Sequence, residues 1–374
     1  MEQKYLHRAS SHSNFHRAQV KMHFSFSLFA QASLFFGAVT SLTIRASNAD
    51  QSYTTKSLTT KAGYTYTYDF APAQNASKPT ILLLHGYPSS RRDWQHQIAS
   101  LTAEGFGIVA PDMLGFGETS KPTEIEAYNG KSLATQLVEI LDAEGLQEVV
   151  GVGHDWGAGV LSKLTTWYPK RFTKLVFVST SYFAAGILFD IDALNKQGLE
   201  TVGYQPFGYW YFFNSWDTAG IIADHLESFI HLAYHTNSSA WAKDFADLGA
   251  ARVWLNANTT TESPSWFPEG YKEHWLREWS QPNITASSLN YYQSLMRGVN
   301  AADEAALTDE DRALNVPVLA IGSARDQIAP PEVQRAMVEP WAKAGFEQHN
   351  VDAGHWATLE RAEEVSQLLI EFAG

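Results

Sequence analysis

The residues best suited to chemistry in this sequence are Gly-His-Asp-Trp-Gly at 153–157, a short run with an acid at its centre. An apolar stretch precedes the run, and a helix-forming segment, 158–167, follows it. Small residues around one central side chain are typical of a nucleophile elbow, a tight turn between a strand and a helix that exposes that side chain. We therefore expect Asp155 to be a nucleophile.

An aspartate at this place restricts the reaction. A serine needs a base to remove its proton, whereas a carboxylate is ionised at neutral pH and can displace a leaving group from saturated carbon directly. The product is an ester that water can attack, while serine would leave an inert ether. Asp155 therefore favours epoxides or alkyl halides over esters and amides, and a buried structural aspartate is the alternative interpretation.

A turn-forming segment, His85-Gly86-Tyr87-Pro88, follows the apolar run 80–84. The backbone N–H of Tyr87 can pair there with that of Trp156 to form an oxyanion hole for the hydrolysis of an ester. The glycine and the proline are expected to fix a tight turn, with a cis peptide bond as one way to build it. An ordinary loop between a strand and a helix is the alternative.

A base and an acid are expected from the last part of the chain. His355, ahead of the final helical segment, can activate the water that attacks the ester. Asp326, just beyond the apolar run 316–321, can hold the imidazole in one tautomer and stabilise it when it is charged. Asp352 and Asp303 are the competing candidates for this acid.

The elements that must position these residues alternate along the chain. Short apolar runs, which suit strands buried on both faces of a parallel sheet, stand at 80–84, 107–110, 148–152, 175–178 and 316–321. Leucine and isoleucine repeat at helical spacing between them, over 131–144. This alternation predicts an α/β fold with a mostly parallel, doubly wound sheet. An alternating segment, 64–68, predicts a strand of an opening hairpin.

The alternation stops between Tyr182 and Asp303, where the chain is rich in aromatic residues and helical in pattern. The simplest interpretation is one α/β core interrupted by an inserted helical cap domain. We therefore predict four parts: a leader at 1–50, the first part of the core at 51–181, the cap at 182–305 and the second part of the core at 306–374.

Together these motifs resemble the soluble α/β-hydrolase-fold epoxide hydrolases, from Tyr53 to Gly374. Residues 85–88 look like the family's His-Gly-x-Pro, 112–117 like its Asp-x-x-Gly-Phe/Tyr-Gly loop, and 154–157 like its nucleophile motif. The order nucleophile, acid, histidine is also that of α/β-hydrolases. The resemblance implies an α/β-hydrolase fold and a vicinal diol as product, and it requires neither a metal nor an organic cofactor.

The resemblance also implies two cap tyrosines that hydrogen-bond the epoxide oxygen and protonate it, since a phenol with a pKa of about 10 suits donation to a developing alkoxide. Tyr292 matches one of these positions, within 289–293. Tyr209 fits the other best, within 207–211, and Tyr211 is the alternate. The substrate pocket is expected to include His85, Pro88, Trp156, Tyr211 and Trp356.

A haloalkane or haloacid dehalogenase is the alternative enzyme, because it shares the nucleophile and most of these motifs. It would need N–H donors for a departing halide, and such enzymes commonly carry Asn where Tyr87 stands. Tyr87 and Tyr292 therefore favour an epoxide. A non-catalytic small-molecule binder is a further alternative, although every catalytic position is kept. An aromatic cap implies an apolar pocket, which admits aryl, terpenoid or fatty-acid epoxides alike.

Composition restricts the partners. The formal net charge of −13 argues against nucleic acid, whose phosphates attract basic surfaces. Cysteine is absent, which excludes disulfides, thiolate nucleophiles and zinc–thiolate sites. The expected partners are therefore a small-molecule epoxide and water.

The leader has the order of a secretory signal. Scattered cations precede the apolar run 24–39, and small polar residues ending Ser47-Asn48-Ala49 follow it. The run is shorter than the roughly twenty residues that span a bilayer, so no stable membrane span is expected after processing. An uncleaved membrane anchor and a true start at Met22 are alternatives. The expected location is the secretory pathway or the exterior, which four Asn-x-Ser/Thr sequons fit: Asn75, Asn237, Asn258 and Asn283.

Overall fold

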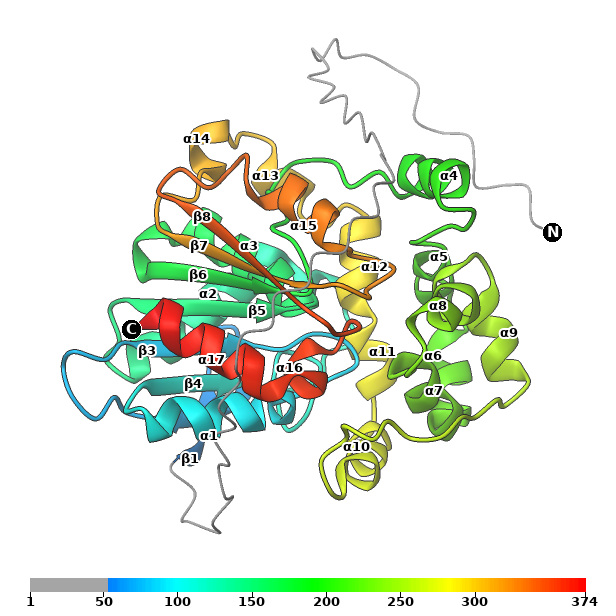
Figure 1. Cartoon of the computed structure of the whole chain (residues 1–374), viewed down its shortest axis with the longest axis horizontal. Coiled ribbons are helices and arrows are strands. Elements are labelled where there is room, and N and C mark those ends of the chain that lie inside the picture. Colours follow the sequence, from blue (N-terminus) through cyan, green and yellow to red (C-terminus); the bar gives the residue numbers. More distant parts are fainter. Residues whose placement is uncertain (1–52) are drawn as a thin grey trace, which may run out of the picture. The chain divides into compact units, whose positions relative to one another are not determined.

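A sheet of eight strands forms the centre of the computed structural model, which describes residues 53–374 (Figure 1). The strand order is β1-β2-β4-β3-β5-β6-β7-β8, in which β2 pairs antiparallel with both β1 and β4 and the other pairs are parallel. The mostly parallel sheet predicted from the apolar runs is confirmed. The strands are β1 Thr54–Thr59, β2 Thr65–Ala71, β3 Thr80–Leu84, β4 Gly107–Pro111, β5 Val149–His154, β6 Phe172–Val178, β7 Val318–Ser323 and β8 Phe346–Val351.

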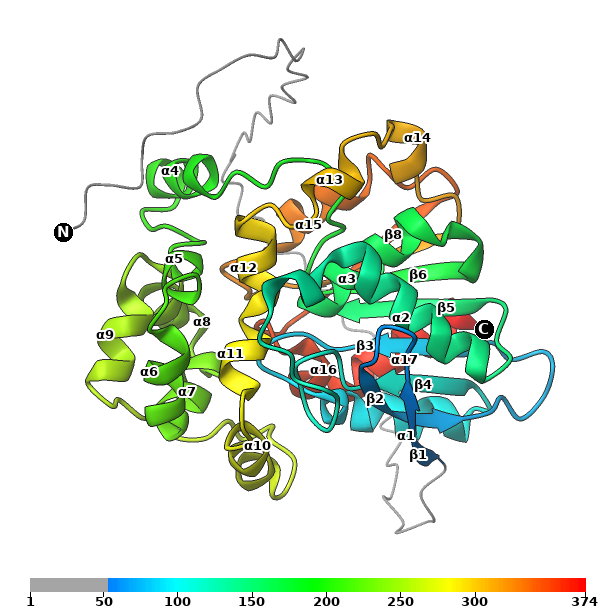
Figure 2. The ribbon, with the colours of Figure 1, turned by 180° about the vertical axis from the view of Figure 1, so that it is seen from behind.

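The inner strands are apolar on both sides because helices cover both faces of the sheet. Figure 1 shows α1 (Gln95–Ala103) and α17 (Ala362–Ala373) in front of the sheet, and Figure 2 shows α2 (Gly130–Ala143) and α3 (Trp156–Trp167) on the other face. Successive side chains of β3 pack against the helices on opposite faces of the sheet, since the side chains of a strand alternate between its faces. Leu83 packs in the cluster of α1 and α17, and Leu82 packs in that of α2 and α3.

The chain leaves the sheet between β6 and β7 and forms the helices of the cap, which lie beyond one end of the strands (Figures 1 and 2). The predicted limits of the cap, 182 and 305, fall between β6 and α4 and directly after α13. The cap helices are α4 Ile191–Thr201, α5 Tyr209–Phe213, α6 Thr218–Asp224, α7 Leu226–Ala233, α8 Ser238–Trp241, the π-helix Ala242–Ala246, α9 Ala250–Asn256, α10 Tyr271–Trp279, α11 Ile284–Ser288 and α12 Asn290–Met296. Helix α13, Ala301–Glu304, also falls within the predicted limits but lies over the core, where Glu304 pairs with Lys163 of α3 at 2.6 Å.

Short helices complete the core around the strand ends. The 3₁₀ helices are η1 Arg91–Trp94, η2 Ile125–Tyr128 and η3 Pro169–Arg171, and the α-helices are α14 Asp309–Arg312, α15 Pro331–Val338 and α16 Ala357–Glu360. No helix among residues 53–374 is long and apolar enough to cross a membrane. The predicted leader, with its secretory signal, lies outside the described residues.

A buried chain of hydrogen bonds joins the cap to the core. Tyr271, the first residue of α10, donates its hydroxyl proton to Oδ1 of Asp93 on η1 at 2.7 Å, and the hydroxyls of Tyr271 and Tyr234 lie 2.9 Å apart. Asp93 is 2% exposed, and its Oδ2 has no hydrogen-bond partner among the described residues. Burial consequently raises the pKa of the Asp93 carboxyl to about 8.

This carboxyl makes the stability of the fold depend on pH. In the unfolded chain an aspartate ionises at about pH 4, whereas folded Asp93 keeps its proton up to about pH 8. The folded state therefore loses stability relative to the unfolded chain as the pH rises through this window. Asp93→Asn keeps an oxygen acceptor for Tyr271 and removes that loss. The melting temperature of this variant minus that of wild type should therefore increase by on the order of 5 °C between about pH 4 and about pH 8. Thermal denaturation of both proteins at several pH values measures this difference. A difference that does not change with pH would contradict the prediction.

Candidate active site

Asp155 lies at the turn between β5 and α3, where the sequence places an elbow. Its backbone has φ 52° and ψ −126°, a conformation that L residues rarely adopt and that fits the strained turn of a nucleophile elbow. Two glycines let the surrounding backbone approach this turn. A Cβ on Gly157 would overlap the carbonyl oxygen of Leu84, and one on Gly86 would overlap the Asp155 carboxylate. The flanking small residues are therefore required by close packing.

The segment after β3 brings a backbone donor to Asp155. The Tyr87 N–H donates to Oδ1 of Asp155 at 2.6 Å, and the peptide bond between Tyr87 and Pro88 is cis. The Trp156 N–H, the second expected donor, lies against Gly86 at the same turn, where a Cβ on that glycine would be 2.6 Å from the Trp156 nitrogen. The structure thus brings both predicted oxyanion donors to the elbow.

His85 supports this turn and does not line the cavity, which corrects its assignment to the substrate pocket. The Met113 N–H donates to His85 Nε2 at 2.9 Å, so the ring proton is on Nδ1, which donates to the carbonyl oxygen of Gly86 at 2.9 Å. Burial lowers the pKa of His85 to about 4, which keeps the ring neutral and this tautomer in place.

His355 lies between Asp155 and one of the three candidate acids, Asp326. Its Nδ1 lies 2.7 Å from Oδ2 of Asp326, and its Nε2 lies 3.5 Å from Oδ2 of Asp155. The other oxygen of Asp326 accepts the N–H groups of Ile328 and Ala329, at 2.8 and 3.0 Å, which fixes the buried carboxylate.

The two competing acids have other partners. Asp352 pairs with Arg325 at 2.9 Å and with Arg361 at 3.2 Å. Asp303 accepts from the side-chain amide of Asn129 at 3.0 Å, at the edge of the cap. Of the three candidates, the structure brings only Asp326 to His355 within the part of the chain that it describes.

Asp155, Asp326 and His355 shift one another's pKa values toward the charged forms of Asp155 and His355. Burial lowers the pKa of His355, but the charge of Asp326 and the bonds to Asp326 and Asp155 outweigh it and raise that pKa to about 10. Burial also raises the pKa of Asp155, but the hydrogen bond and the charge of His355 outweigh it and hold that pKa below its ordinary value. Asp155 is therefore an anion at neutral pH, paired with a protonated imidazole.

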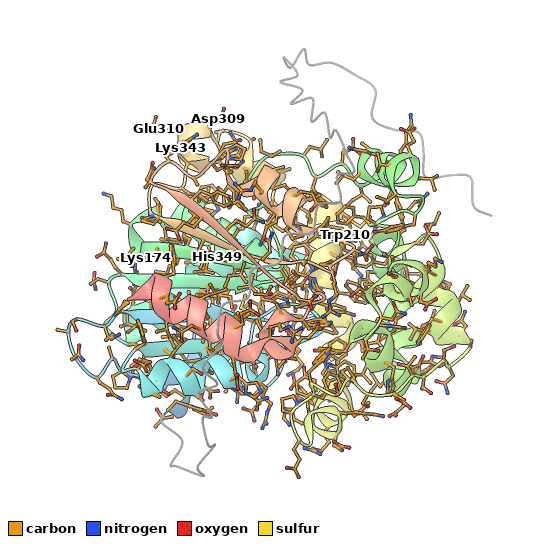
Figure 3. All side chains as sticks on the ribbon, viewed as in Figure 1. Lys174, Trp210, Asp309, Glu310, Lys343 and His349 are labelled. Atoms are coloured by element: carbon orange, nitrogen blue, oxygen red, sulfur yellow. The ribbon has the colours of Figure 1, made fainter. Side chains whose placement is uncertain are left out.

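Above this group lies an apolar cavity of about 830 Å³, counting the part open to solvent. Most of the predicted site residues line it: Tyr87, Pro88, Asp155, Trp156, Tyr209, Tyr292, His355 and Trp356. Aromatic residues of the cap, which had no individual signal in the sequence, form much of the wall: Phe189, Phe207, Trp210, Phe229, Trp241 and Phe245. Figure 3 labels Trp210 where the cap faces the core.

Two phenols of the cap meet on this wall. The rings of Tyr209, on α5, and Tyr292, on α12, are 5.9 Å apart and nearly perpendicular, and the Tyr292 ring lies 5.0 Å from that of Trp156. Burial, with the charge of Asp155 adding to it, raises the pKa of Tyr209 above its usual range. The pKa of Tyr292 is raised by burial, with Tyr209 and Asp155 adding. Both hydroxyls therefore carry a proton at neutral pH.

Tyr211 is not on the cavity, which corrects its assignment to the pocket and to the alternate acid position. Its hydroxyl donates to Asp192 on α4. Two residues along a helix are about 200° apart around the axis, so Tyr209 and Tyr211 point to opposite sides of α5.

The comparisons with known proteins agree with this geometry. Residues 79–362 match the sequence model described as alpha/beta hydrolase fold. The chain belongs to the α/β-hydrolase fold family. Among curated relatives, this α/β-hydrolase-fold chain is 26% identical over 309 residues to bifunctional epoxide hydrolase 2 of Sus scrofa, covering 79% of this chain and 51% of that protein. It is 26% identical over 294 residues to epoxide hydrolase A of Mycobacterium tuberculosis, covering 79% and 90%.

The chain thus spans about half the length of the mammalian relatives that it matches. Two solved structures resemble the fold of this α/β-hydrolase. Epoxide hydrolase A from Mycobacterium thermoresistibile has a TM-score of 0.70 at 24% identity, covering 86% of this chain and 98% of that one. An epoxide hydrolase from an endophytic Streptomyces has a TM-score of 0.72 at 23% identity, covering 86% and 95%.

Proposed function

We propose that this protein hydrolyses epoxides to vicinal diols through an ester on Asp155. The observation that carries the proposal is the pair of buried, protonated phenols, Tyr209 and Tyr292, on the same cavity wall as the anionic Asp155. A carboxylate and two acids are what the opening of an epoxide requires, and the relatives named epoxide hydrolases support the same reaction.

The first step forms the ester. The Tyr87 N–H holds Oδ1 of Asp155, which leaves Oδ2 to attack one epoxide carbon. As the ring C–O bond breaks, Tyr209 and Tyr292 donate hydrogen bonds to the oxygen, and one of them transfers its proton. The developing alkoxide is thereby neutralised inside an apolar cavity, where a free charge would be costly.

The second step hydrolyses the ester. Once Asp155 is alkylated its negative charge is gone, and with it one cause of the raised pKa of His355. The imidazolium then gives up its proton, which returns to the phenolate left by the first step. Neutral His355 takes a proton from water, the water attacks the ester carbonyl, and the oxyanion forms where the Tyr87 N–H points. Collapse of this intermediate breaks the bond between the carbonyl carbon and Oδ2. The leaving alkoxide takes the proton of the hydroxyl that water has added, which gives the diol and restores the Asp155 carboxylate, with His355 again an imidazolium.

A comparison of Tyr292→Phe with wild type tests the role of the phenols. We expect the variant to lose kcat/KM on an aryl epoxide by about 100-fold, because an acid in proton transfer contributes at least this much. A matched alkyl halide needs no proton on its leaving group, so its turnover, if any, should change little. Diol formation is measured for the epoxide and halide release for the alkyl halide, under the same conditions.

Tyr291→Phe is the control for this test, because it removes a neighbouring buried phenol that donates to the carbonyl oxygen of Leu114. That variant should keep wild-type turnover of epoxides. Halide release without epoxide turnover by wild type would establish a haloalkane dehalogenase in place of the proposal. A haloacid is a poorer substrate for this site, since no lysine or arginine lines the cavity within residues 53–374 to hold its carboxylate.

We also infer that the protein enters the secretory pathway. The basic, apolar and small-residue order of the leader supports this, and so do the four sequons. Asn75 is exposed, whereas the side-chain oxygen of Asn237 accepts the N–H groups of Ser239 and Ala240 at the start of α8. The amino-terminal sequence of protein recovered from the medium tests the inference, and retention of the whole leader inside cells would contradict it.

A further inference from the structure

Helix α10 belongs to the cap, yet its buried face reaches the part of the core that carries the oxyanion hole. Tyr271, Trp275 and Trp279 are 6, 3 and 1% exposed. Their spacing of four residues puts them on one face of the helix. Each of the three contacts the segment from Tyr87 to Asp93.

The contacts of this face follow the core segment in order. The Trp279 ring meets the Tyr87 ring edge-on, with centroids 5.6 Å apart. The Trp275 indole N–H donates to the carbonyl oxygen of Pro88 at 2.8 Å in a buried hydrogen bond. Tyr271 donates to Asp93 at 2.7 Å. Helix α10 therefore contacts the oxyanion turn through Trp275 and Trp279. Its first residue, Tyr271, bonds to the core at Asp93.

Side chains of the core bind the same turn at another carbonyl oxygen, that of Gly86. His85 and the Ser89 hydroxyl both donate to the carbonyl oxygen of Gly86, at 2.9 and 3.1 Å. These bonds fix the peptide that precedes Tyr87. The Trp275 indole N–H fixes the peptide that follows Pro88. The Tyr87 N–H therefore lies between two fixed carbonyl groups, that of Gly86, bonded by the core, and that of Pro88, bonded by the cap.

We propose that Trp275 is a positioning residue for the hydrolysis of the ester, and that the bond between Tyr271 and Asp93 anchors the helix that carries it. This proposal rests on the proposed function. Trp275 is not among the residues that line the cavity, and it acts through the Pro88 carbonyl on the direction of the Tyr87 N–H.

The two chemical steps depend differently on that N–H. During alkylation Oδ1 of Asp155 loses negative charge, so its hydrogen bond from Tyr87 becomes weaker and does not assist the step. During hydrolysis negative charge develops on the same oxygen, so the hydrogen bond becomes stronger and lowers the barrier. A misdirected N–H should therefore slow hydrolysis of the ester and leave its formation nearly unchanged.

Single-turnover experiments with excess enzyme and a styrene-oxide-type epoxide separate the steps. Acid quenching and intact-protein mass spectrometry follow the formation and the decay of the alkylated chain. For Trp275→Phe we expect the adduct to decay about 10-fold more slowly than in wild type, less than the effect of losing an oxyanion donor outright, and to form within about 2-fold of the wild-type rate. In steady state, kcat and KM should fall together while kcat/KM is kept.

Trp254→Phe is the matched control. Its indole N–H also donates to a backbone carbonyl within the cap, that of Ser228 at 3.2 Å, but Trp254 is neither on the cavity nor at the oxyanion turn. This variant should form and hydrolyse the adduct at wild-type rates. A slow decay in both variants would indicate a general loosening of the cap and would overturn the specific role of Trp275.

The decay rate counts only chains that have been alkylated, so a partly unfolded sample does not imitate the effect. Tyr271→Phe releases the anchor of the same helix, and its adduct should decay about 3-fold more slowly, since small displacements of a donor already cost rate. The proposal is overturned if the adduct of Trp275→Phe decays at the wild-type rate, or if that of Tyr271→Phe does so where Trp275→Phe does not fold. It is also overturned if the adduct forms slowly but decays at the wild-type rate. The absence of any adduct in wild type would instead overturn the proposed function itself.

Discussion

Asp155→Ala is expected to hydrolyse epoxides at least about 10⁴-fold more slowly than wild type, because removal of a nucleophile forces water to open the ring without a covalent step. The phenols, the oxyanion donors and the cavity stay in place, so a weak residual rate should remain. Diol formation from an aryl epoxide measures the loss, and circular dichroism checks the fold. Asp303→Ala, which removes an acid bonded to Asn129 at the edge of the cap, should keep wild-type activity.

Labelled water tests the covalent route in the wild-type enzyme. In a single turnover in ¹⁸O-water, the oxygen added to the diol should come from Asp155 and be unlabelled, while the label enters the carboxylate. In later turnovers that label should reach the diol. Labelled diol from the first turnover would show direct attack by water, and substantial activity of Asp155→Ala would contradict the role of the carboxylate as well.

The elbow could be predicted because its physical requirements are local. A strand must end, a helix must begin, and small residues must let the backbone come close, as the contacts of Gly157 with Leu84 and of Gly86 with Asp155 require. The buried strands were found for a similar reason, since β3, β4 and β5 are buried along their whole length and are apolar except for Thr80 and His154 at strand ends. β8 gave no such signal, because it is an edge strand in which every residue but Val351 is exposed or half-buried.

The partners of the elbow depend on the order of the strands. Asp155, Asp326 and His355 follow β5, β7 and β8, and the carboxyl ends of parallel strands meet at one edge of a sheet. Chain order alone could not exclude Asp352, which stands three residues before His355 but turns toward Arg325 and Arg361. The choice among the acids therefore needed the structure.

The cap was the least predictable part, because its helices are short and aromatic residues stand on several of their faces. The assignment of Tyr209 over Tyr211 depends on which side of α5 meets the cavity, and a five-residue helix has no periodic pattern that would tell. The bond from Trp275 to the Pro88 carbonyl joins residues 187 positions apart, so no local pattern indicates it. Contacts of this kind arise from packing between the cap and the core.

His355→Gln is expected to stop turnover after one alkylation, with about one adduct per chain and a loss of steady-state rate of about 10⁴-fold. The amide of glutamine can still donate a hydrogen bond to the buried Asp326, but it cannot take a proton from water. The ester should therefore form and persist. Intact-protein mass spectrometry after mixing with epoxide measures the adduct, and steady-state diol formation measures the rate.

The pH at which the adduct forms adds a second check on His355. In wild type, burial raises the pKa of Asp155, but the hydrogen bond and the charge of His355 outweigh it and hold that pKa below its ordinary value. Without the imidazolium burial should dominate, so the pKa of Asp155 rises and alkylation by His355→Gln needs a higher pH than in wild type. His235→Gln, a change at a histidine away from the cavity, should keep both steps. Continued turnover by His355→Gln would mean that another group activates the water.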